Sequence, residues 1–213
     1  MRNGAQAIAG YKLGTQVNVG RVAEMPIDTD ASLVERFLGG DTTAFDALFD
    51  KYQSYVYRIV YGILGNAAEA QDVTQDVFVQ VYRSFHQFNR TARFATWLYR
   101  IAVNRSVDRT RSGRKWRWLS LNDDHPDLQN ITVPGPEESL AEASIRNQAQ
   151  TALMHLSIAD RQVIVLRYYQ ELSIEEIAAV LGASVNAIKL RLHRARLRFK
   201  AELLAIDGGY LDE

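Results

Sequence analysis

The sequence has no cysteine among its 213 residues. This absence excludes a disulfide framework, a thiol nucleophile, and zinc or iron–sulfur sites built on cysteine. Only four prolines occur, so helices can run uninterrupted over most of the chain. No stretch approaches about 18 consecutive apolar residues, so we expect no membrane insertion. The composition favours a helical protein of the cytoplasm with one or two domains.

The formal net charge is zero, with 25 basic and 25 acidic residues, but the charge is unevenly distributed. Seven basic residues and one acid lie between Arg100 and Arg117, and six basic residues and no acid lie between Lys189 and Lys200. Residues 66–80 hold three acids and no base. Because local patches determine partners more than the total charge does, the sequence predicts separate basic and acidic surfaces.

Apolar residues recur at spacings of three and four, which is the period of an amphipathic helix. The pattern predicts that Gly39-Gly40 ends the first helix, that Asp41 caps the second, and that Gly65-Asn66 ends it. No strand-like alternation appears, so the predicted fold class is all-α. The expected helices span about 30–37, 41–64, 67–85, 94–111, 145–156, 158–169, 173–181 and 184–204.

The helical pattern breaks after Arg111. The following stretch contains Gly113 and three prolines, and acids outnumber bases by six to two over 115–142. Such a composition is typical of an extended linker. We therefore predict two small helical domains joined by a flexible acidic linker, with the C-terminal domain a helix-turn-helix. The expected boundaries are 1–27 for a disordered extension, 28–114 and 144–206 for the domains, 115–143 for the linker, and 207–213 for a tail.

The most specific local pattern lies at the C-terminal end. Ser173 and Glu176 form a predicted capping box, Gly182 permits a tight turn, and Ser184 caps the next helix. Two short helices joined in this way make a helix-turn-helix, whose second helix enters the major groove of DNA. A solvated basic helix in an ordinary bundle is the alternative. The outward-facing candidates for base and phosphate contacts are Asn186, Lys189, Leu190, His193 and Arg194.

Aromatic and basic residues are interleaved between Phe88 and Trp118. Aromatic rings stack on unpaired bases and arginines follow the backbone, so this combination suits single-stranded nucleic acid. The alternative is that the aromatic residues belong to the core, which we favour for Trp97. For Phe88 and Asn104 both interpretations stay open.

A third pattern is a polar face on the predicted helix 67–85. On spacing alone, a solvated face is the simpler interpretation, and a docking surface for a basic partner is the functional one. The face consists of Glu69, Asp72, Gln75, Asp76 and Gln80.

These three features, in this order, resemble the extracytoplasmic-function group of sigma factors, which belongs to the sigma-70 family of bacterial RNA polymerase. The resemblance covers roughly residues 32–112 and 145–203, and Leu156, Ser157 and Arg161 contribute to it. Its motifs are AQDVTQDVF at 70–78, FATWLYRIAVN at 94–104, LSIEEIA at 172–178 and RLHRAR at 191–196.

The resemblance implies a factor that directs core RNA polymerase to specific promoters and promotes melting of the minus-10 element during transcription initiation. Sigma region 2 would occupy 28–114 and sigma region 4 would occupy 144–206. The implied partners are promoter DNA, the clamp of the largest polymerase subunit and the flap of the second-largest subunit. Stress-responsive control by an anti-sigma factor is also implied, whereas no cofactor and no metal are.

The resemblance also implies residue roles. Core-polymerase contacts fall on Asp72, Gln75, Asp76 and Phe78. Minus-10 contacts fall on Phe88, Arg100, Ile101, Asn104 and Arg105, and Phe88, Ile101 and Asn104 would hold a flipped base. Minus-35 contacts fall on Ser184, Asn186, Lys189, Leu190, Arg191, His193 and Arg194.

Three other functions compete with this one. A stand-alone helix-turn-helix regulator would bind duplex DNA without polymerase and would need neither the acidic face nor the aromatic and basic segment. A purely protein-binding adaptor or anti-sigma protein is disfavoured by the basic helix at Lys189–Lys200. An enzyme is disfavoured because no phosphate-binding glycine loop and no Ser-His-Asp arrangement appears. The four histidines, His86, His125, His155 and His193, also lie on separate elements.

Overall fold

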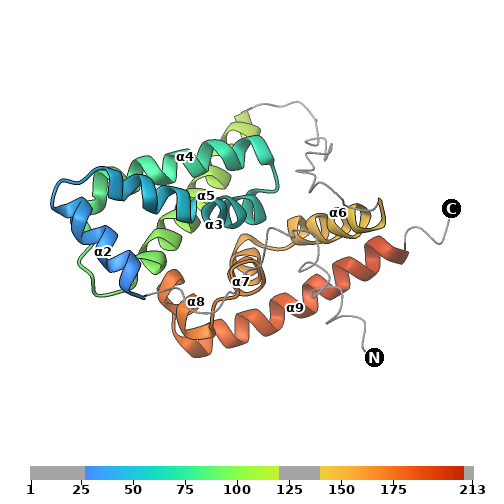
Figure 1. The fold of residues 1–213 in the computed structure, drawn as a ribbon. Coiled ribbons are helices and arrows are strands. Elements are labelled where there is room, and N and C mark those ends of the chain that lie inside the picture. Colours follow the sequence, from blue (N-terminus) through green and yellow to red (C-terminus); the bar gives the residue numbers. More distant parts are fainter. Residues whose placement is uncertain (1–26, 120–139, 209–213) are drawn as a thin grey trace.

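The computed structural model describes residues 27–119 and 140–208, and within them the side chains of residues 30–112 and 143–206. Every regular element in these ranges is a helix, so the all-α prediction is confirmed (Figure 1). The predictions for residues 1–26, 120–139 and 209–213 lie outside the described residues. No helix in the described ranges is long and apolar enough to cross a membrane.

The first group of helices is built around α3 (Thr43–Leu64). This helix packs against α2 (Ile27–Leu38), α4 (Ala67–Ser84) and α5 (Phe94–Leu119). A short 3-10 turn, η1 (Phe85–Gln87), follows α4. Full burial of an aliphatic side chain stabilises a fold by roughly 1.5–3 kcal/mol, and α3 contributes a complete stripe of such residues. The stripe consists of Leu48, Val56, Ile59, Val60 and Ile63.

The second group is organised by α9 (Val185–Gly208), the long C-terminal helix. It packs against α6 (Leu140–His155), α7 (Ile158–Tyr168) and α8 (Ile174–Leu181). Figure 1 shows α9 running past these three helices at the edge of the molecule. The apolar side chains that hold the group together are Leu153, Val163, Leu166, Ile177, Ile188 and Leu192.

Polar side chains mark the helix ends where the sequence predicted them. The Asp41 carboxylate accepts a hydrogen bond from the Thr43 backbone N–H at 3.0 Å and lies 2.6 Å from the Arg36 guanidinium. The hydrogen bond from the Thr43 side chain and then that from Arg36 lower the pKa of the Asp41 carboxyl. Gly65 ends α3 in the left-handed conformation, and Asn66 caps α4 by accepting from the Glu69 N–H. Gly65 confirms the predicted end of α3. The N-cap position of α3 is Thr42 rather than the predicted Asp41, and the Thr42 side chain makes no capping hydrogen bond.

One helix is longer than predicted. The pattern ended the fourth helix near Arg111, whereas α5 continues to Leu119. Gly113 costs a helix only about 1 kcal/mol relative to alanine, and arginine and lysine beside it are good helix formers. Since the next proline is Pro126, nothing at 112–119 terminates the helix. Both α5 and α6 therefore extend into the predicted linker 115–143.

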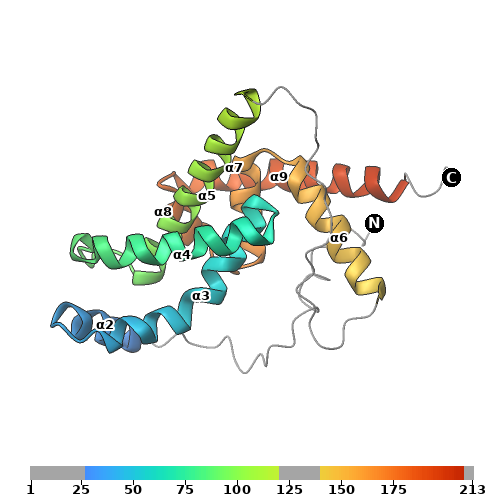
Figure 2. The same ribbon diagram turned by 90° about the horizontal axis from the view of Figure 1, so that it is seen from above.

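The two groups of helices are in contact with each other. Helix α3 packs against α6 and α7, and α5 packs against α8 (Figures 1 and 2). The sequence predicted a connection through a linker but no packing between the domains. This contact includes Arg100 of α5, one of the predicted minus-10 residues.

The predicted capping box at α8 is present in full. The Ser173 hydroxyl accepts from the Glu176 N–H at 3.1 Å, and the Glu176 carboxylate accepts from the Ser173 N–H at 2.8 Å. We expect Ser173→Ala to lower the free energy of unfolding by about 1 kcal/mol, because one helix N–H loses its acceptor. Urea denaturation followed by circular dichroism measures this. Ser173→Asp, which keeps an acceptor, is the control, and equal losses for both substitutions would contradict the capping role.

Candidate functional site

The acidic face of α4 divides into two parts. At its ends, the Glu69 carboxylate pairs with Arg109 at 3.3 Å, and the Gln80 side-chain oxygen accepts from Arg105 at 2.5 Å. Between them, Asp72, Gln75 and Asp76 are exposed. Among the side chains that the structure describes, none pairs with these three. The middle of the face is therefore available to a partner.

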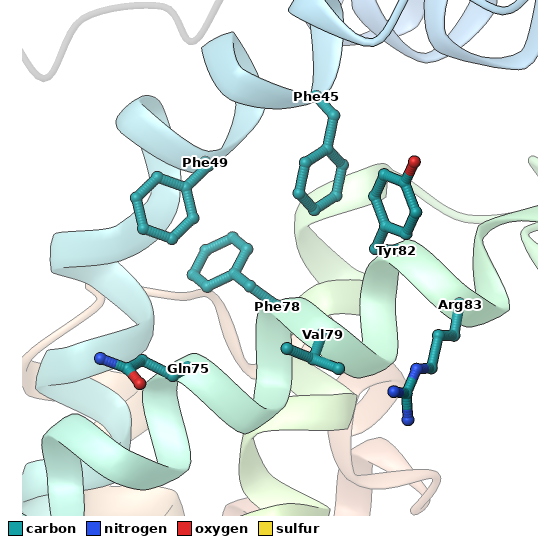
Figure 3. Close-up of a pocket in the computed structure, with 7 residues that line it drawn as sticks. All are labelled: Phe45, Phe49, Gln75, Phe78, Val79, Tyr82 and Arg83. Atoms are coloured by element: carbon teal, nitrogen blue, oxygen red, sulfur yellow. The ribbon is translucent and has the colours of Figure 1, made fainter.

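An apolar pocket adjoins this available stretch. It lies between α3 and α4 and has a volume of about 440 Å³. Figure 3 shows the rings of Phe45 and Phe49 from α3 facing those of Phe78 and Tyr82 from α4. The Phe49 and Phe78 rings stand edge to face with centroids 4.7 Å apart. Gln75, Val79 and Arg83 complete the lining.

The predicted core-polymerase residues are thus brought together, but in different roles. Asp72, Gln75 and Asp76 project from the surface, whereas Phe78 is only 4% exposed and forms the floor of the pocket. Val79 and Tyr82, at 47% and 51% exposure, were not among the predicted site residues. Large apolar side chains this exposed beside a pocket indicate an interaction surface. The three-residue spacing of Val79 and Tyr82, which puts both on one face of the helix, could have indicated this surface from the sequence.

The aromatic residues of the second predicted surface mostly lie in the core. Phe88 is 8% exposed, and its ring centroid lies 5.2 Å from that of Trp97 and 5.8 Å from that of Phe94. Ile101 is 9% exposed. Asn104 and Arg105 follow it on α5 and are exposed. The accessible polar part of this surface is consequently the middle of α5, resting on an aromatic cluster.

Arg100 has an unexpected partner. Its guanidinium donates to the backbone oxygens of Ala179 at 2.5 Å and Val180 at 3.3 Å, near the C-terminal end of α8. Arg93, which precedes α5, lies 3.4 Å from the Glu176 carboxylate on the same helix. Cations are favourable near helix C-termini because the last carbonyls lack partners within the helix. Arg100 therefore joins the two groups of helices in this structure.

The third surface has the geometry of a helix-turn-helix. Gly182 adopts the left-handed conformation, with φ of 62°, between α8 and α9. Its lack of a Cβ makes this turn inexpensive. The Ser184 hydroxyl accepts from the Ala187 N–H and caps α9. Ile188 and Leu192 face the core, and Arg191 is partly buried. The remaining predicted minus-35 residues are all exposed, namely Ser184, Asn186, Lys189, Leu190, His193 and Arg194.

An ion pair between a buried carboxylate and an exposed arginine joins α7 to α9. Asp160 is almost fully buried at the start of α7, where its carboxylate pairs with the Arg198 guanidinium at 2.5 Å. Ser157 is the N-cap of α7, and its hydroxyl accepts from the Asp160 N–H. Because removal of Arg198 would leave the buried Asp160 carboxylate without this cation, the contact favours the observed position of α9.

Family models match both halves of the chain. Sigma-70 region 2 matches residues 48–117, and Sigma-70 region 4 matches residues 146–199. The ECF RNA polymerase sigma factor SigW of Bacillus subtilis is 34% identical over 170 residues, which are 77% of this chain and 91% of SigW. The E. coli K12 sigma-E factor is 34% identical over 176 residues, covering 79% and 91% of the two chains.

A solved structure has the same fold. CnrH, determined in complex with the cytosolic domain of CnrY, superposes with a TM-score of 0.63 at 28% identity over 84% of this chain and 99% of CnrH. The helix-turn-helix and the all-helical first domain define a two-part transcription factor. The chain belongs to the extracytoplasmic-function sigma factors of the sigma-70 family, as the sequence patterns predicted. Proteins of this family are non-catalytic transcription initiation factors for RNA polymerase.

Substitutions in the pocket can distinguish a residue that stabilises the fold from one that is exposed and available to a partner. We expect Phe78→Ala to reduce the free energy of unfolding by about 3–5 kcal/mol, since the ring is buried. Tyr82→Ala should cost no more than about 1 kcal/mol, because the side chain is half exposed and loses mainly its ring contacts with Phe45 and Phe37. Urea denaturation of both variants tests this. Similar losses in the two would show that Tyr82 is a core residue.

Proposed function

We propose that α4 docks on the clamp of the largest subunit of RNA polymerase. The observation that carries this proposal is the exposed stretch of Asp72, Gln75 and Asp76 beside the apolar pocket, which pairs with no other side chain in the described part of the structure. Protein interfaces combine a central apolar pocket with a polar rim, and aromatic side chains supply much of their affinity. A basic partner surface carrying one apolar side chain for the pocket would match both parts.

We further propose that the middle of α5 binds the minus-10 element. Asn104 offers both a donor and an acceptor to a base edge, and Arg105 offers a cation to the phosphate backbone. Extruding a base from the stack costs a few kcal/mol. A binding surface held rigid by the cluster of Phe88, Phe94 and Trp97 does not have to be ordered during that step. In this proposal Phe88 and Ile101 shape the base pocket from within the core.

The proposed minus-35 reader is the N-terminal half of α9. A recognition helix contacts base edges with its first turns, and Asn186, Lys189 and Arg194 are exposed there. Lysine and arginine suit guanine edges, and asparagine suits adenine. The same group of helices is also proposed to meet the flap of the second-largest subunit. All of these steps take place in the cytoplasm, where we place the protein.

Control by a second protein is part of the proposal. CnrH was solved bound to the cytosolic domain of CnrY, and we expect an anti-sigma factor to bind this chain. We assign no catalytic step to the protein itself. A stand-alone DNA-binding regulator is the second candidate function. The capped helix α8, the turn at Gly182 and the capped helix α9 form a helix-turn-helix from C-terminal residues alone.

The primary test is run-off transcription with purified bacterial core polymerase on promoter fragments from the native genome. We expect discrete transcripts only when the protein is added. The combined substitution Asp72→Ala and Asp76→Ala should reduce the transcript yield at limiting protein at least about tenfold, which corresponds to about 1.4 kcal/mol of binding free energy.

The matched control replaces two exposed acids on α3, Asp46→Ala with Asp50→Ala. This variant changes the net charge equally and should transcribe like the unaltered protein. Equal losses in both double variants would mean that only total charge matters. If no transcript appears and the protein alone retards duplex DNA, the stand-alone regulator becomes the better description.

Base reading by α9 predicts a contrast between two lysines. Lys189→Ala, near the start of the helix, should cost about 1–3 kcal/mol on a cognate promoter and relax the preference at one position. Lys200→Ala, three turns further on, should weaken binding uniformly across sequences and reduce the salt slope by about one. Binding of the polymerase holoenzyme to a set of minus-35 variants, measured at several salt concentrations, distinguishes the two. A uniform effect of Lys189→Ala would argue against base reading at that residue.

A further inference from the structure

A row of leucines runs along the outer side of α9, which lies at the edge of the molecule (Figure 1). Leu190, Leu197 and Leu204 follow one another at intervals of seven residues, and each is at least half exposed. Seven residues are almost two helical turns, so the three side chains lie on one side of the helix over about 21 Å. The buried Ile188 and Leu192 lie on the opposite side. Large apolar side chains exposed in a row indicate a surface for a partner.

The residues between the leucines complete the pattern of a coiled-coil seam. Arg194 and Ala201 are both exposed, and with them the spacing alternates between four and three residues. In the heptad repeat of a coiled coil, the leucines then occupy the d positions, and Arg194 and Ala201 occupy the a positions. A polar residue at a single a position fixes the register of two paired helices, which is the place of Arg194. The leucine seam consists of Leu190, Arg194, Leu197, Ala201 and Leu204.

The positions that flank the leucine seam are basic. Between its two ends, the e and g positions are Arg191, His193, Arg198 and Lys200. Arg198 pairs with Asp160, yet its side chain is 60% exposed. In coiled coils the charges at e and g determine which helix is accepted as a partner. A second copy of α9 would place basic residues opposite basic residues in either orientation, whereas a helix with carboxylates at these positions is complementary.

The leucine seam overlaps the proposed minus-35 reader. Leu190, His193 and Arg194 belong to both surfaces. The major groove of DNA is about 12 Å wide and admits one helix, which is about 10–12 Å in diameter with its side chains. A second helix lying along the whole seam and a duplex around the first turns of α9 would therefore occupy the same space.

We propose that the leucine seam is a docking site for an acidic amphipathic helix of another protein, and that this helix competes with minus-35 DNA for α9. The proposal rests on the proposed reading of minus-35 DNA by α9. The partner helix carries apolar residues at heptad spacing and carboxylates beside them. The site is opposite in charge to the pocket on α4, whose acidic border suits a basic partner. Docking leaves the packing of α9 on α6, α7 and α8 in place, because that packing uses the other side of the helix.

Three designed peptides test the chemistry of the site. All have about four heptads: the first has leucine at a and d with glutamate at e and g, the second replaces the glutamates with lysine, and the third replaces the leucines with serine. We expect the full-length protein to bind the first peptide at least about tenfold more tightly than either of the others. Fluorescence anisotropy of the labelled peptides measures this. No binding of the first peptide, or equal binding of either control peptide, would overturn the proposal.

A double variant locates the site on α9. Leu197→Ser with Leu204→Ser removes two seam leucines that are not among the proposed DNA contacts. Because both side chains are mostly exposed, the variant should fold, which circular dichroism checks. We expect it to bind the glutamate peptide at least about tenfold more weakly and to support run-off transcription like the unaltered protein. The control Leu38→Ser, at an exposed leucine on α2, should bind the peptide normally, and an equal loss in both variants would contradict docking at the seam.

Competition separates this proposal from the sigma function. The glutamate peptide should inhibit run-off transcription by the unaltered protein and should not inhibit the double variant. If the unaltered protein does not transcribe even without peptide, the sigma function is refuted, while the binding measurements still decide whether the seam accepts an acidic helix. A peptide that binds the seam without inhibiting transcription would overturn the competition.

Sedimentation equilibrium of the free protein examines the remaining occupant, a second copy of the chain. The basic flanks of the seam predict that α9 does not pair with itself. A dimer that is lost in the double variant would show that the seam serves self-association, and would overturn the proposal.

Discussion

Helix α3 is the element on which both halves of the molecule depend. One side carries the stripe from Leu48 to Ile63 and forms the core of the first group with α4 and α5. The other side, at Gly62, receives Val165 of α7. A helix with apolar contacts on two sides cannot shift to improve one contact without disturbing the other, because protein interiors are close-packed. The position of α4, and with it the acidic face and the pocket, follows from how α3 is held.

Charge is distributed so that the same residue types serve different purposes on different surfaces. The ends of the acidic face are tied down, Glu69 by Arg109 and Gln80 by Arg105. Exposed pairs of this kind stabilise a fold by at most about 1 kcal/mol, so they are easily exchanged for other partners. Arg105 is also a proposed DNA contact, so binding of a phosphate would compete with its hydrogen bond to Gln80. The net charge of zero thus conceals surfaces that interact with one another in the unbound chain.

Local patterns predicted the parts of the structure that local chemistry determines. The capping box at Ser173, the turn at Gly182 and the cap at Ser184 each depend on residues within three or four positions of one another. The exposure of Lys189 and Arg194 followed from the helical period. The pocket was only partly predictable, because Phe45 and Phe49 reach it from a different helix. The predicted C-terminal end of α5 was wrong, because the unfavourable Gly113 does not outweigh its helix-forming neighbours.

The contact between the groups was not predictable from the sequence patterns, and the reason is physical. Its members are separated by about 80 to 115 residues, and several of the acceptors are backbone oxygens, which every residue has. Only Gly62 carries a local sign of the contact. A glycine in the interior of a helix costs about 1 kcal/mol relative to alanine, and no turn or positive φ requires one there. The close approach of Val165 supplies the missing reason. The glycine inside α3 thus marks a place where a distant segment packs.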